Sequence, residues 1–373
     1  MDQAIYDVAI IGLGAVGSAT TYQLSKTPLN IIGIDRFHPP HQMGSSHGET
    51  RITRLAVGEG EDYVALAKRS HEIWAEIQAK TGKKIYHPVG GILMDSGLEP
   101  WAKHGSEGFF ERTVRFANSQ HISHQILSSE ELQRRFPAFL LPKEGKVYVE
   151  PSAGYVLPEL AIETQLALAQ AQGATLCYGH PVLGISKIDV LFQLDLGNTH
   201  IRARKVVCTA GGWILDFLPE EQRSRFKVCR QLLHWIKADF DLTDWSAYPI
   251  WMWGFGSQPE DFIYGFPSLD HQSVKMATES FLPSDHPDLL NRSVNKEEQD
   301  QFWEEKVAGK IAGLKPEFIK SEVCFYTVTA DARFVLEPLG NDSNFLLVSA
   351  CSGHGFKHSA ALGERIAEMM SFS

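Results

Sequence analysis

The sequence predicts an α/β or α+β protein of two interleaved domains, and three observations support this fold class. The chain has 373 residues, 43% of them hydrophobic, whereas a single core stops growing at about 250–300 residues. A strand, a glycine turn and a helix near the N-terminus predict a parallel sheet with helices on its faces. Residues 230–279, rich in aromatic and β-branched side chains, instead favour several antiparallel strands.

Each element is predicted from local residue patterns. Residues 6–11 form a β-branched run, residues 18–25 favour a helix, and residues 30–35 favour a second strand, which together make a βαβ unit. Further helices are expected at residues 63–80, 129–136, 158–172, 297–308 and 358–370. Further strands are expected at residues 91–94, 191–196, 205–208, 230–238, 249–255, 262–267, 273–279 and 344–348.

Charge and cysteine content exclude several classes of protein. The formal net charge is −10, whereas nucleic-acid-binding proteins collect Lys and Arg on one face, so a small-molecule ligand is expected. The five cysteines lack paired spacing and indicate neither a disulfide framework nor a zinc cluster. Residues 1–7 lack a basic signal-peptide region, and no run of about 18 apolar residues could span a membrane. We therefore expect a cytoplasmic protein.

A G-x-G-x-x-G motif at residues 12–17 predicts a dinucleotide site, because it lies between a predicted strand and a predicted helix. Gly12 permits the tight turn, Gly14 lets the backbone approach a pyrophosphate, and Gly17 allows close packing of helix and strand. Asp35 ends the second strand, where its carboxylate can accept hydrogen bonds from ribose hydroxyls. The motif alone does not separate FAD from NAD, and a bare glycine loop is the alternative.

A longer run resolves this choice. Residues 39–41 (PPH) and 44–54 (GSSHGETRITR) closely resemble a segment of the monomeric sarcosine oxidase family, which includes N-methyltryptophan oxidase and pipecolate oxidase. Similar pieces follow in the same order over nearly the whole chain. They are GEG at 58–60, KVVCTAGGW at 205–213, YGFP at 264–267, VK at 274–275, CFYT at 324–327 and SGHGFK at 352–357.

The resemblance implies an FAD-dependent oxidase, usually monomeric, that oxidises the C–N bond of an N-methyl or cyclic amino acid. Hydride passes to the flavin, O2 is reduced to H2O2, and the imine is hydrolysed. We assign residues 1–85, 150–218 and 320–373 to a Rossmann-type FAD-binding domain. Residues 86–149 and 219–319 are assigned to a smaller substrate domain with a mixed or antiparallel sheet.

The resemblance also assigns roles to single residues. Cys324 matches the cysteine that binds the 8α-methyl group of the flavin, although any lone cysteine could be an ordinary buried thiol. Arg54 and Lys357 match the pair that holds the substrate carboxylate. Arg51 and His47 match residues near the flavin ring. Lys275 matches the lysine that promotes reaction with oxygen, where a fixed cation stabilises developing negative charge.

The expected pocket holds Tyr264, Tyr326, Met252 and Glu279. Glu279 stands where sarcosine oxidases tend to carry His, which makes sarcosine itself a doubtful substrate, and the aromatic cluster around Met252 could instead be core. His354 and His358 have the spacing of a metal pair but no third ligand, so no metal is expected. The residues expected around FAD are Gly12, Gly14, Ala15, Val16, Gly17, Asp35, Arg36, Ser45, Ser46, Arg51, Val182, Ala210, Gly211, Trp213, Cys324, Gly353, His354, Gly355, Phe356 and Lys357.

Three alternatives stay open at this point. The first is another FAD enzyme, such as a glycine, D-amino-acid or fructosyl-amine oxidase, or a dehydrogenase with another acceptor. The second is a nicotinamide-dependent dehydrogenase, which shares the glycine motif but has no reason to contain Cys324 in its context. The third is a non-catalytic FAD-binding or assembly protein, which need not retain Arg54, Lys275 and Lys357.

Overall fold

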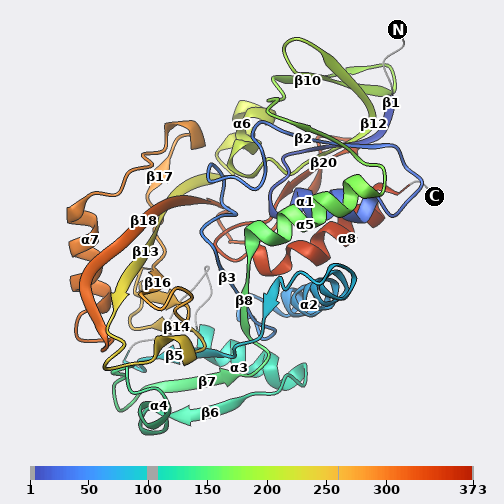
Figure 1. The fold of residues 1–373 in the computed structure, drawn as a ribbon. Coiled ribbons are helices and arrows are strands. Elements are labelled where there is room, and N and C mark those ends of the chain that lie inside the picture. Colours follow the sequence, from blue (N-terminus) through green and yellow to red (C-terminus); the bar gives the residue numbers. More distant parts are fainter. Residues whose placement is uncertain (1–4, 99–107, 259, 372–373) are drawn as a thin grey trace.

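The computed structural model describes residues 5–98, 108–258 and 260–371, and the remaining parts of the predicted domain ranges lie outside the described residues. Two lobes make up the described part, each built on one large sheet (Figure 1). The chain crosses between the sheets several times, because strands close in space come from distant parts of the sequence. The mixed α/β fold with interleaved sheets is therefore confirmed.

The first lobe contains a parallel sheet in the order β9-β2-β1-β12-β20. These strands are Ile5–Ile11 (β1), Ile31–Asp35 (β2), Thr175–Tyr178 (β9), His200–Cys208 (β12) and Asp342–Ser349 (β20); antiparallel β10 (Gly184–Ile188), β11 (Leu191–Asp195) and β19 (Val335–Leu339) extend the sheet. Helices α1 (Ala15–Leu24), α5 (Pro158–Ala171) and α8 (Ser359–Met370) pack together beside it, and α2 (Glu61–Thr81) contacts α8 (Figure 1). The sheet is buried on both faces, which explains the continuous apolar runs of β1 and β2.

The second lobe contains a nine-stranded sheet in which only β5 and β14 pair in parallel. Its strands are Gly91–Asp95 (β5), Gln125–Ser128 (β6), Lys146–Glu150 (β7), Lys227–Ala238 (β13), Ile250–Gly254 (β14), Phe262–Gly265 (β15), Ser273–Ala277 (β16), Pro283–Ser284 (β17) and Leu314–Val328 (β18). The predicted domain boundary at residue 320 falls inside β18, which pairs with β13 as far as Val328. Sheet pairing therefore places this crossing after residue 328.

Shorter elements connect the two lobes. A small antiparallel sheet joins β3 (Arg51–Thr53), β8 (Gly154–Val156) and β4 (Tyr86–His87). The remaining helices are α3 (Phe109–Ser119), α4 (Ser129–Arg135), α6 (Glu220–Arg223) and α7 (Lys296–Phe302), with short helical turns at Gly211–Phe217, Trp245–Ala247, Pro287–Leu289, Trp303–Val307 and Phe356–His358. The helix expected at 297–308 is thus α7 followed by a separate π-helical turn.

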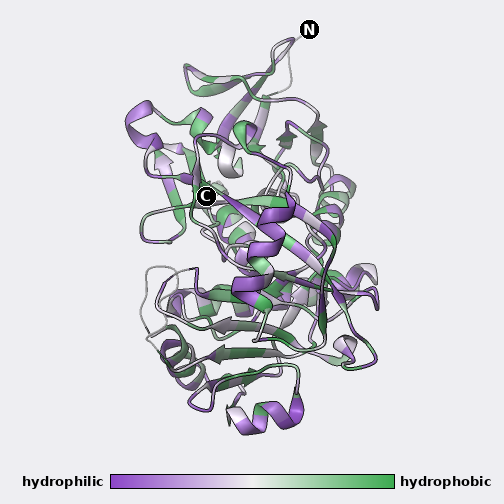
Figure 2. Ribbon diagram, turned by 90° about the vertical axis from the view of Figure 1, so that its left-hand side faces the viewer, coloured by the Kyte–Doolittle hydropathy of each residue, from purple (hydrophilic) through white to green (hydrophobic). Residues whose placement is uncertain are grey.

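All five residues of β14 are buried, and the direction in which each side chain points decides its role. Trp251 and Trp253 point into the core on one side of the sheet, packed with Trp245. Met252 points to the other side, where it packs near Tyr264. Neighbouring residues of a strand face opposite ways, so the tryptophans are core and Met252 faces the pocket. Figure 2 shows hydrophobic residues gathered along the strands and hydrophilic residues along loops and outer helical turns.

Among residues 5–98, 108–258 and 260–371, no helix combines the length and the apolar character needed to cross a bilayer.

Candidate cofactor and substrate site

A cavity of about 600 Å³ is lined by residues of both large sheets. It begins at the glycine turn after β1 and extends to the pocket beside Met252 and Tyr264. All the predicted site residues line it except Gly17, His47 and Lys275. One cavity therefore brings together the predicted cofactor and substrate positions, whose individual roles remain predictions.

Packing requires a glycine residue at two positions of the first glycine turn. Gly12 has a φ of +86°, and a Cβ there would lie 2.7 Å from the carbonyl oxygen of Thr209. A Cβ on Gly17 would lie 1.8 Å from the carbonyl oxygen of Gly12. Asp35 holds the same turn, because its Oδ2 accepts a hydrogen bond from Leu13 N at 2.7 Å. Contacts within the chain thus hold the shape of the turn.

Gly14 leaves room for a ligand. A Cβ at this position would meet only Ser46 Oγ, at 3.8 Å. Gly14 also begins α1, whose first turn has neither a side-chain cap nor an acidic residue. The free amide groups and the helix dipole favour a phosphate here. The diphosphate of FAD fits this cradle.

The outer end of the cavity contains an aromatic and charged cluster. Arg36 lies over the ring of Trp213 at 5.1 Å and contacts Asp288 Oδ2 at 3.3 Å. Trp213 donates to the other oxygen of Asp288 at 2.8 Å. Asp288 belongs to a segment after β17, so the second lobe reaches over the cofactor end of the cavity.

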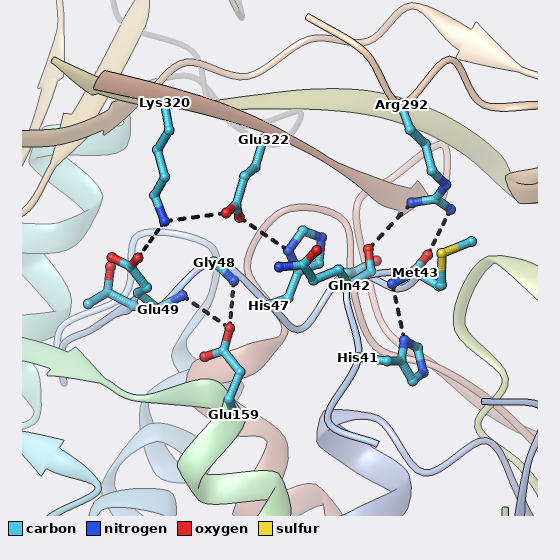
Figure 3. A network of polar contacts seen from close by, with 12 residues as sticks. His41, Gln42, Met43, His47, Gly48, Glu49, Glu159, Arg292, Lys320 and Glu322 are labelled. Atoms are coloured by element: carbon cyan, nitrogen blue, oxygen red, sulfur yellow. Dashed lines mark hydrogen bonds and ion pairs between the residues drawn. The ribbon is translucent and has the colours of Figure 1, made fainter. Parts of the chain in front are cut away.

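The loop at residues 41–49 is held by groups from several distant elements (Figure 3). The carboxylate of Glu159 accepts from Gly48 N at 2.7 Å and Glu49 N at 3.1 Å. Arg292 donates to the carbonyl oxygen of Met43 at 2.8 Å. Since Ser45 and Ser46 on this loop line the cavity, these contacts position them.

A second glycine turn leads into the last helix. Gly353 has a φ of +81°, and a Cβ on Gly355 would lie 1.8 Å from the carbonyl oxygen of Ala350. The turn places Phe356 and Lys357 on the cavity wall at the start of the C-terminal helical segment. This second turn lies beside β18, because Ser352 N donates a hydrogen bond to the carbonyl oxygen of Thr327 at 3.0 Å.

Cys324 is 2% exposed and lines the cavity. Burial raises the pKa of its thiol, while Arg51 and Lys275 act in the opposite direction. Arg51 is fixed by donating to the carbonyl oxygens of Ser45 and Thr50 at 2.7 and 2.8 Å. A second cysteine, Cys351, lines the same cavity, so the structure itself offers two thiols to a bound cofactor.

His47 lies outside the cavity lining. It is 2% exposed, and its Nδ1 is 3.6 Å from Glu322 Oε2 (Figure 3). Burial lowers the pKa of His47, and the contact with Glu322 opposes this effect. Glu322 precedes Cys324 by two residues in β18, so both side chains lie on one face of the strand. His47 can therefore act on the cavity only through neighbouring groups.

Lys275 lies on the far side of the backbone wall at residues 48–51. Its Nζ donates to the carbonyl oxygens of Gly48 and Thr50, the latter at 2.9 Å. Burial, followed by the charge of Arg51, holds the pKa of Lys275 well below its ordinary value. The side chain lines a second cavity of about 180 Å³, together with Trp235. Lys275 and Arg51 both donate to the carbonyl oxygen of Thr50, so the two cations lie close together although they line different cavities.

The predicted carboxylate-binding pair already holds a carboxylate. Arg54 Nη2 lies 3.2 Å from Glu59 Oε2, and Lys357 Nζ lies 3.2 Å from Glu59 Oε1. Arg54 and Lys357 are 4% and 7% exposed. Glu59 lies in the GEG piece, five residues after Arg54, but sequence patterns assign it no role because Lys357 comes from the other end of the chain. The geometry shows that the pair can bind one carboxylate with both oxygens.

The remaining pocket residues form a polar group beside this pair. The hydroxyls of Tyr264 and Tyr326 are hydrogen-bonded to each other. Burial raises the pKa of both hydroxyls, and the nearby carboxylate of Glu279 adds to the effect. Glu279 is 3% exposed and lines the cavity with Met252. The pocket thus offers neutral hydroxyls and a second carboxylate to a ligand.

The fold and the site define a class of protein, one that binds a dinucleotide cofactor and a small ligand in adjoining parts of one cavity. The chain belongs to the FAD-dependent oxidoreductase family known as DAO, whose model matches residues 7–369. Within the described residues, no group of three or more His, Cys, Asp or Glu side chains could hold a metal ion.

Curated relatives lead to the same family. Monomeric sarcosine oxidase from Bacillus sp. (strain NS-129) is 30% identical over 98% of this chain and 92% of its own length. N-methyl-L-tryptophan oxidase from Yersinia pestis (strain Pestoides F) is 30% identical over 96% and 93%. The predicted relationship to these oxidases and the prediction of an FAD-dependent oxidoreductase are confirmed.

Solved structures share the fold at lower identity. The amino acid oxidase NikD in its open form has a TM-score of 0.83 at 20% identity, covering 98% of this chain and 93% of its own. Glycine oxidase from Geobacillus kaustophilus has a TM-score of 0.76 at 18% identity, covering 98% and 94%.

Proposed function

We propose that this protein oxidises the C–N bond of a secondary amine that carries a carboxylate, such as an N-methyl or cyclic amino acid. FAD, when bound along the glycine turns, supplies the two-electron oxidation, and O2 is the final acceptor, giving H2O2. Water hydrolyses the imine product. The curated relatives, which are named for sarcosine and N-methyl-L-tryptophan, support this substrate class.

The observation that carries the proposal is the convergence of Arg54 and Lys357 on one carboxylate, with 3.2 Å contacts to its two oxygens. An arginine and a lysine in a nearly closed pocket bind carboxylates strongly, since little water competes. Tyr264, Tyr326 and Met252 line the same cavity and would surround the amine. Binding the carboxylate thus orients the reacting C–N bond.

Three residues are proposed to act on the chemistry itself. Arg51, fixed by two backbone carbonyls, places a cation at the cavity wall beside Cys324. His47 is a buried imidazole held near Glu322, and it supports the position of this wall. Lys275, from its separate compartment, would stabilise the negative charge that develops on O2.

Cys324 is proposed to hold FAD covalently through an 8α-S-cysteinyl bond. Arg51 and Lys275 would supply the positive charge that a nucleophilic thiolate requires, against the rise in the pKa of the thiol that burial causes. We also propose that the protein is a cytoplasmic monomer. The name of the relative, monomeric sarcosine oxidase, supports the oligomeric state in this proposal.

A second candidate is an oxidase of primary amino acids, because glycine oxidases share the fold. The buried carboxylate of Glu279 would stabilise the ammonium form of a primary or a secondary amine alike. A panel read out by peroxide release separates the two candidates. Turnover of N-methyl and cyclic amino acids above glycine and D-amino acids supports the first, and the reverse order supports the second.

The first experiment is an absorbance spectrum of the purified protein followed by acid precipitation. Flavin bands with colour retained in the pellet support covalent FAD. Colour released into the supernatant contradicts the covalent bond but leaves the proposed oxidase activity intact. A flavoprotein that releases no peroxide with any amine in the panel would contradict the proposed activity.

A further inference from the structure

Glu59 occupies the position that the proposed function gives to the substrate carboxylate. We infer that Glu59 determines specificity, as an internal carboxylate that a ligand must replace on Arg54 and Lys357 before it can bind. This inference rests on the proposed function, and it selects for ligands that carry a carboxylate of their own.

The two contacts of Glu59 use both of its oxygens, one on each cation, at 3.2 Å. Arg54 also donates to the carbonyl oxygen of Ala56, and Lys357 donates to that of His354 at 3.1 Å. These backbone bonds fix the two cations whether or not Glu59 is present. The cationic pair is therefore a prepared binding site, and the side chain of Glu59 and a ligand carboxylate would exclude each other from it.

The backbone around Glu59 is anchored, so the exchange involves its side chain. A Cβ on Gly58 would lie 2.7 Å from Thr113 Oγ1, which shows how closely this segment packs on α3. The carbonyl oxygen of Glu59 accepts from Arg112 Nη2 at 3.3 Å. Gly60, which follows, is extended with a φ of 163° and precedes α2. A rotation of the Glu59 side chain is thus a smaller change than movement of the segment.

Selectivity follows from charge. Arg54 and Lys357 carry two positive charges, and Glu59 neutralises one of them. A ligand carboxylate can replace Glu59 because it restores the same two contacts. An amine without a carboxylate leaves Glu59 in place, since removing it would strand two buried cations. Glu59 therefore weakens the binding of every carboxylate ligand. It also prevents ligands without a carboxylate from binding to Arg54 and Lys357.

The test compares Glu59→Gln with Glu61→Gln in the holoenzyme. Glu61 lies two residues away, on the exposed first turn of α2. Its carboxylate accepts a hydrogen bond from Gln120 and not from the cationic pair. The probes are 2-furoate and its neutral amide, 2-furamide. Their binding is measured by the change in flavin absorbance. We expect the Kd of 2-furoate to fall at least tenfold in Glu59→Gln and to stay unchanged in Glu61→Gln. The Kd of 2-furamide should change less than twofold in either variant.

Unchanged or weaker 2-furoate binding in Glu59→Gln would overturn the inference. Glu59→Asp, which keeps the charge on a shorter side chain, should lie between wild type and Glu59→Gln, and it serves alone if Glu59→Gln fails to fold. An equal Kd in Glu59→Asp and wild type then counts against the inference. Wild type that binds no 2-furoate yet oxidises amines without a carboxylate would instead sink the proposed function.

Discussion

The ammonium group of Lys275 donates to the carbonyl oxygen of Thr50 at 2.9 Å, which fixes the lysine on the wall between two cavities. On the other side of this wall, Arg51 lines the larger cavity. The carbonyl oxygen of Thr50 thus accepts from both cations, Arg51 and Lys275. This arrangement yields the first prediction.

Lys275→Met should slow the reaction of the reduced enzyme with O2 by about 100-fold, because the fixed cation that stabilises developing charge is lost. The rate of flavin reduction by substrate should change little. Both rates are measured by stopped-flow absorbance. Lys320→Met is the control, since Lys320 lines the same second cavity but lies over Trp235 and is paired with Glu49. An equal loss in both variants would contradict a specific role for Lys275.

Cys324→Ser should release the yellow colour on acid precipitation, because serine is a poorer nucleophile than a thiolate stabilised by Arg51 and Lys275. Cys351→Ser should keep the colour in the pellet. Cys351 is a close control because it lines the same cavity and its pKa is also raised by burial. If only Cys351→Ser released the colour, the covalent attachment would have to be assigned to Cys351 and not to Cys324.

Arg54→Lys should lower kcat/KM for a carboxylate-bearing amine by about 10- to 100-fold, the usual effect of losing a charge-assisted hydrogen bond. The loss should appear mainly in KM, because binding of the carboxylate is affected. Lys83→Met, two residues beyond the end of α2, should have no effect. Steady-state peroxide assays provide the measurement, and an equal loss with the corresponding carboxamide would contradict a carboxylate contact.

Gly14→Ala and Gly17→Ala should separate cofactor binding from folding. The Cβ at position 14 meets nothing closer than 3.8 Å, so the protein should fold but retain less FAD. The Cβ at position 17 would lie 1.8 Å from a backbone oxygen, so this variant should lose about 3 kcal/mol of stability. Thermal unfolding and flavin content measure the two effects. Full FAD content in Gly14→Ala would contradict the phosphate cradle.

His234 should make stability depend on pH. Burial lowers its pKa from 6.5 to about 4, so the unfolded chain binds more protons than the folded protein between these values. The free energy of unfolding therefore rises with pH through this window, by about 3 kcal/mol at most. His234→Gln should reduce this rise, whereas the exposed His200→Gln should not. Urea unfolding at several pH values between 4.5 and 7 is the measurement, and parallel curves for wild type and His234→Gln would refute it.

Sequence patterns could bring the residues predicted for the cofactor to one cavity, because their signals are local. The glycines of both turns and Asp35 act within a few residues of one strand or helix, where spacing defines geometry. The substrate half depends on contacts across the chain. Glu59 meets Lys357, which lies in the last part of the sequence, and Asp288 meets Arg36 from the other lobe. No spacing rule reports such pairs.

Strand β18 shows a different limit. It contains Pro316 and the alternating charges of Lys320 and Glu322, features typical of loops or edge strands. In the structure it pairs with β13 along the exposed edge of the sheet and becomes buried only from Val323 onward. Tertiary pairing thus overrides local preference, and the same strand carries Cys324 into the cavity.

The order in which the cavity is assembled has a consequence for the biosynthesis of the holoenzyme. Its lining runs from Ile11, in the first strand, to Lys357, at the start of the last helix. During translation, the N-terminal glycine turn leaves the ribosome long before β18 and the second glycine turn can close around it. Because residues from both ends of the chain line the cavity, its wall is complete only once the residues up to Lys357 have been synthesised.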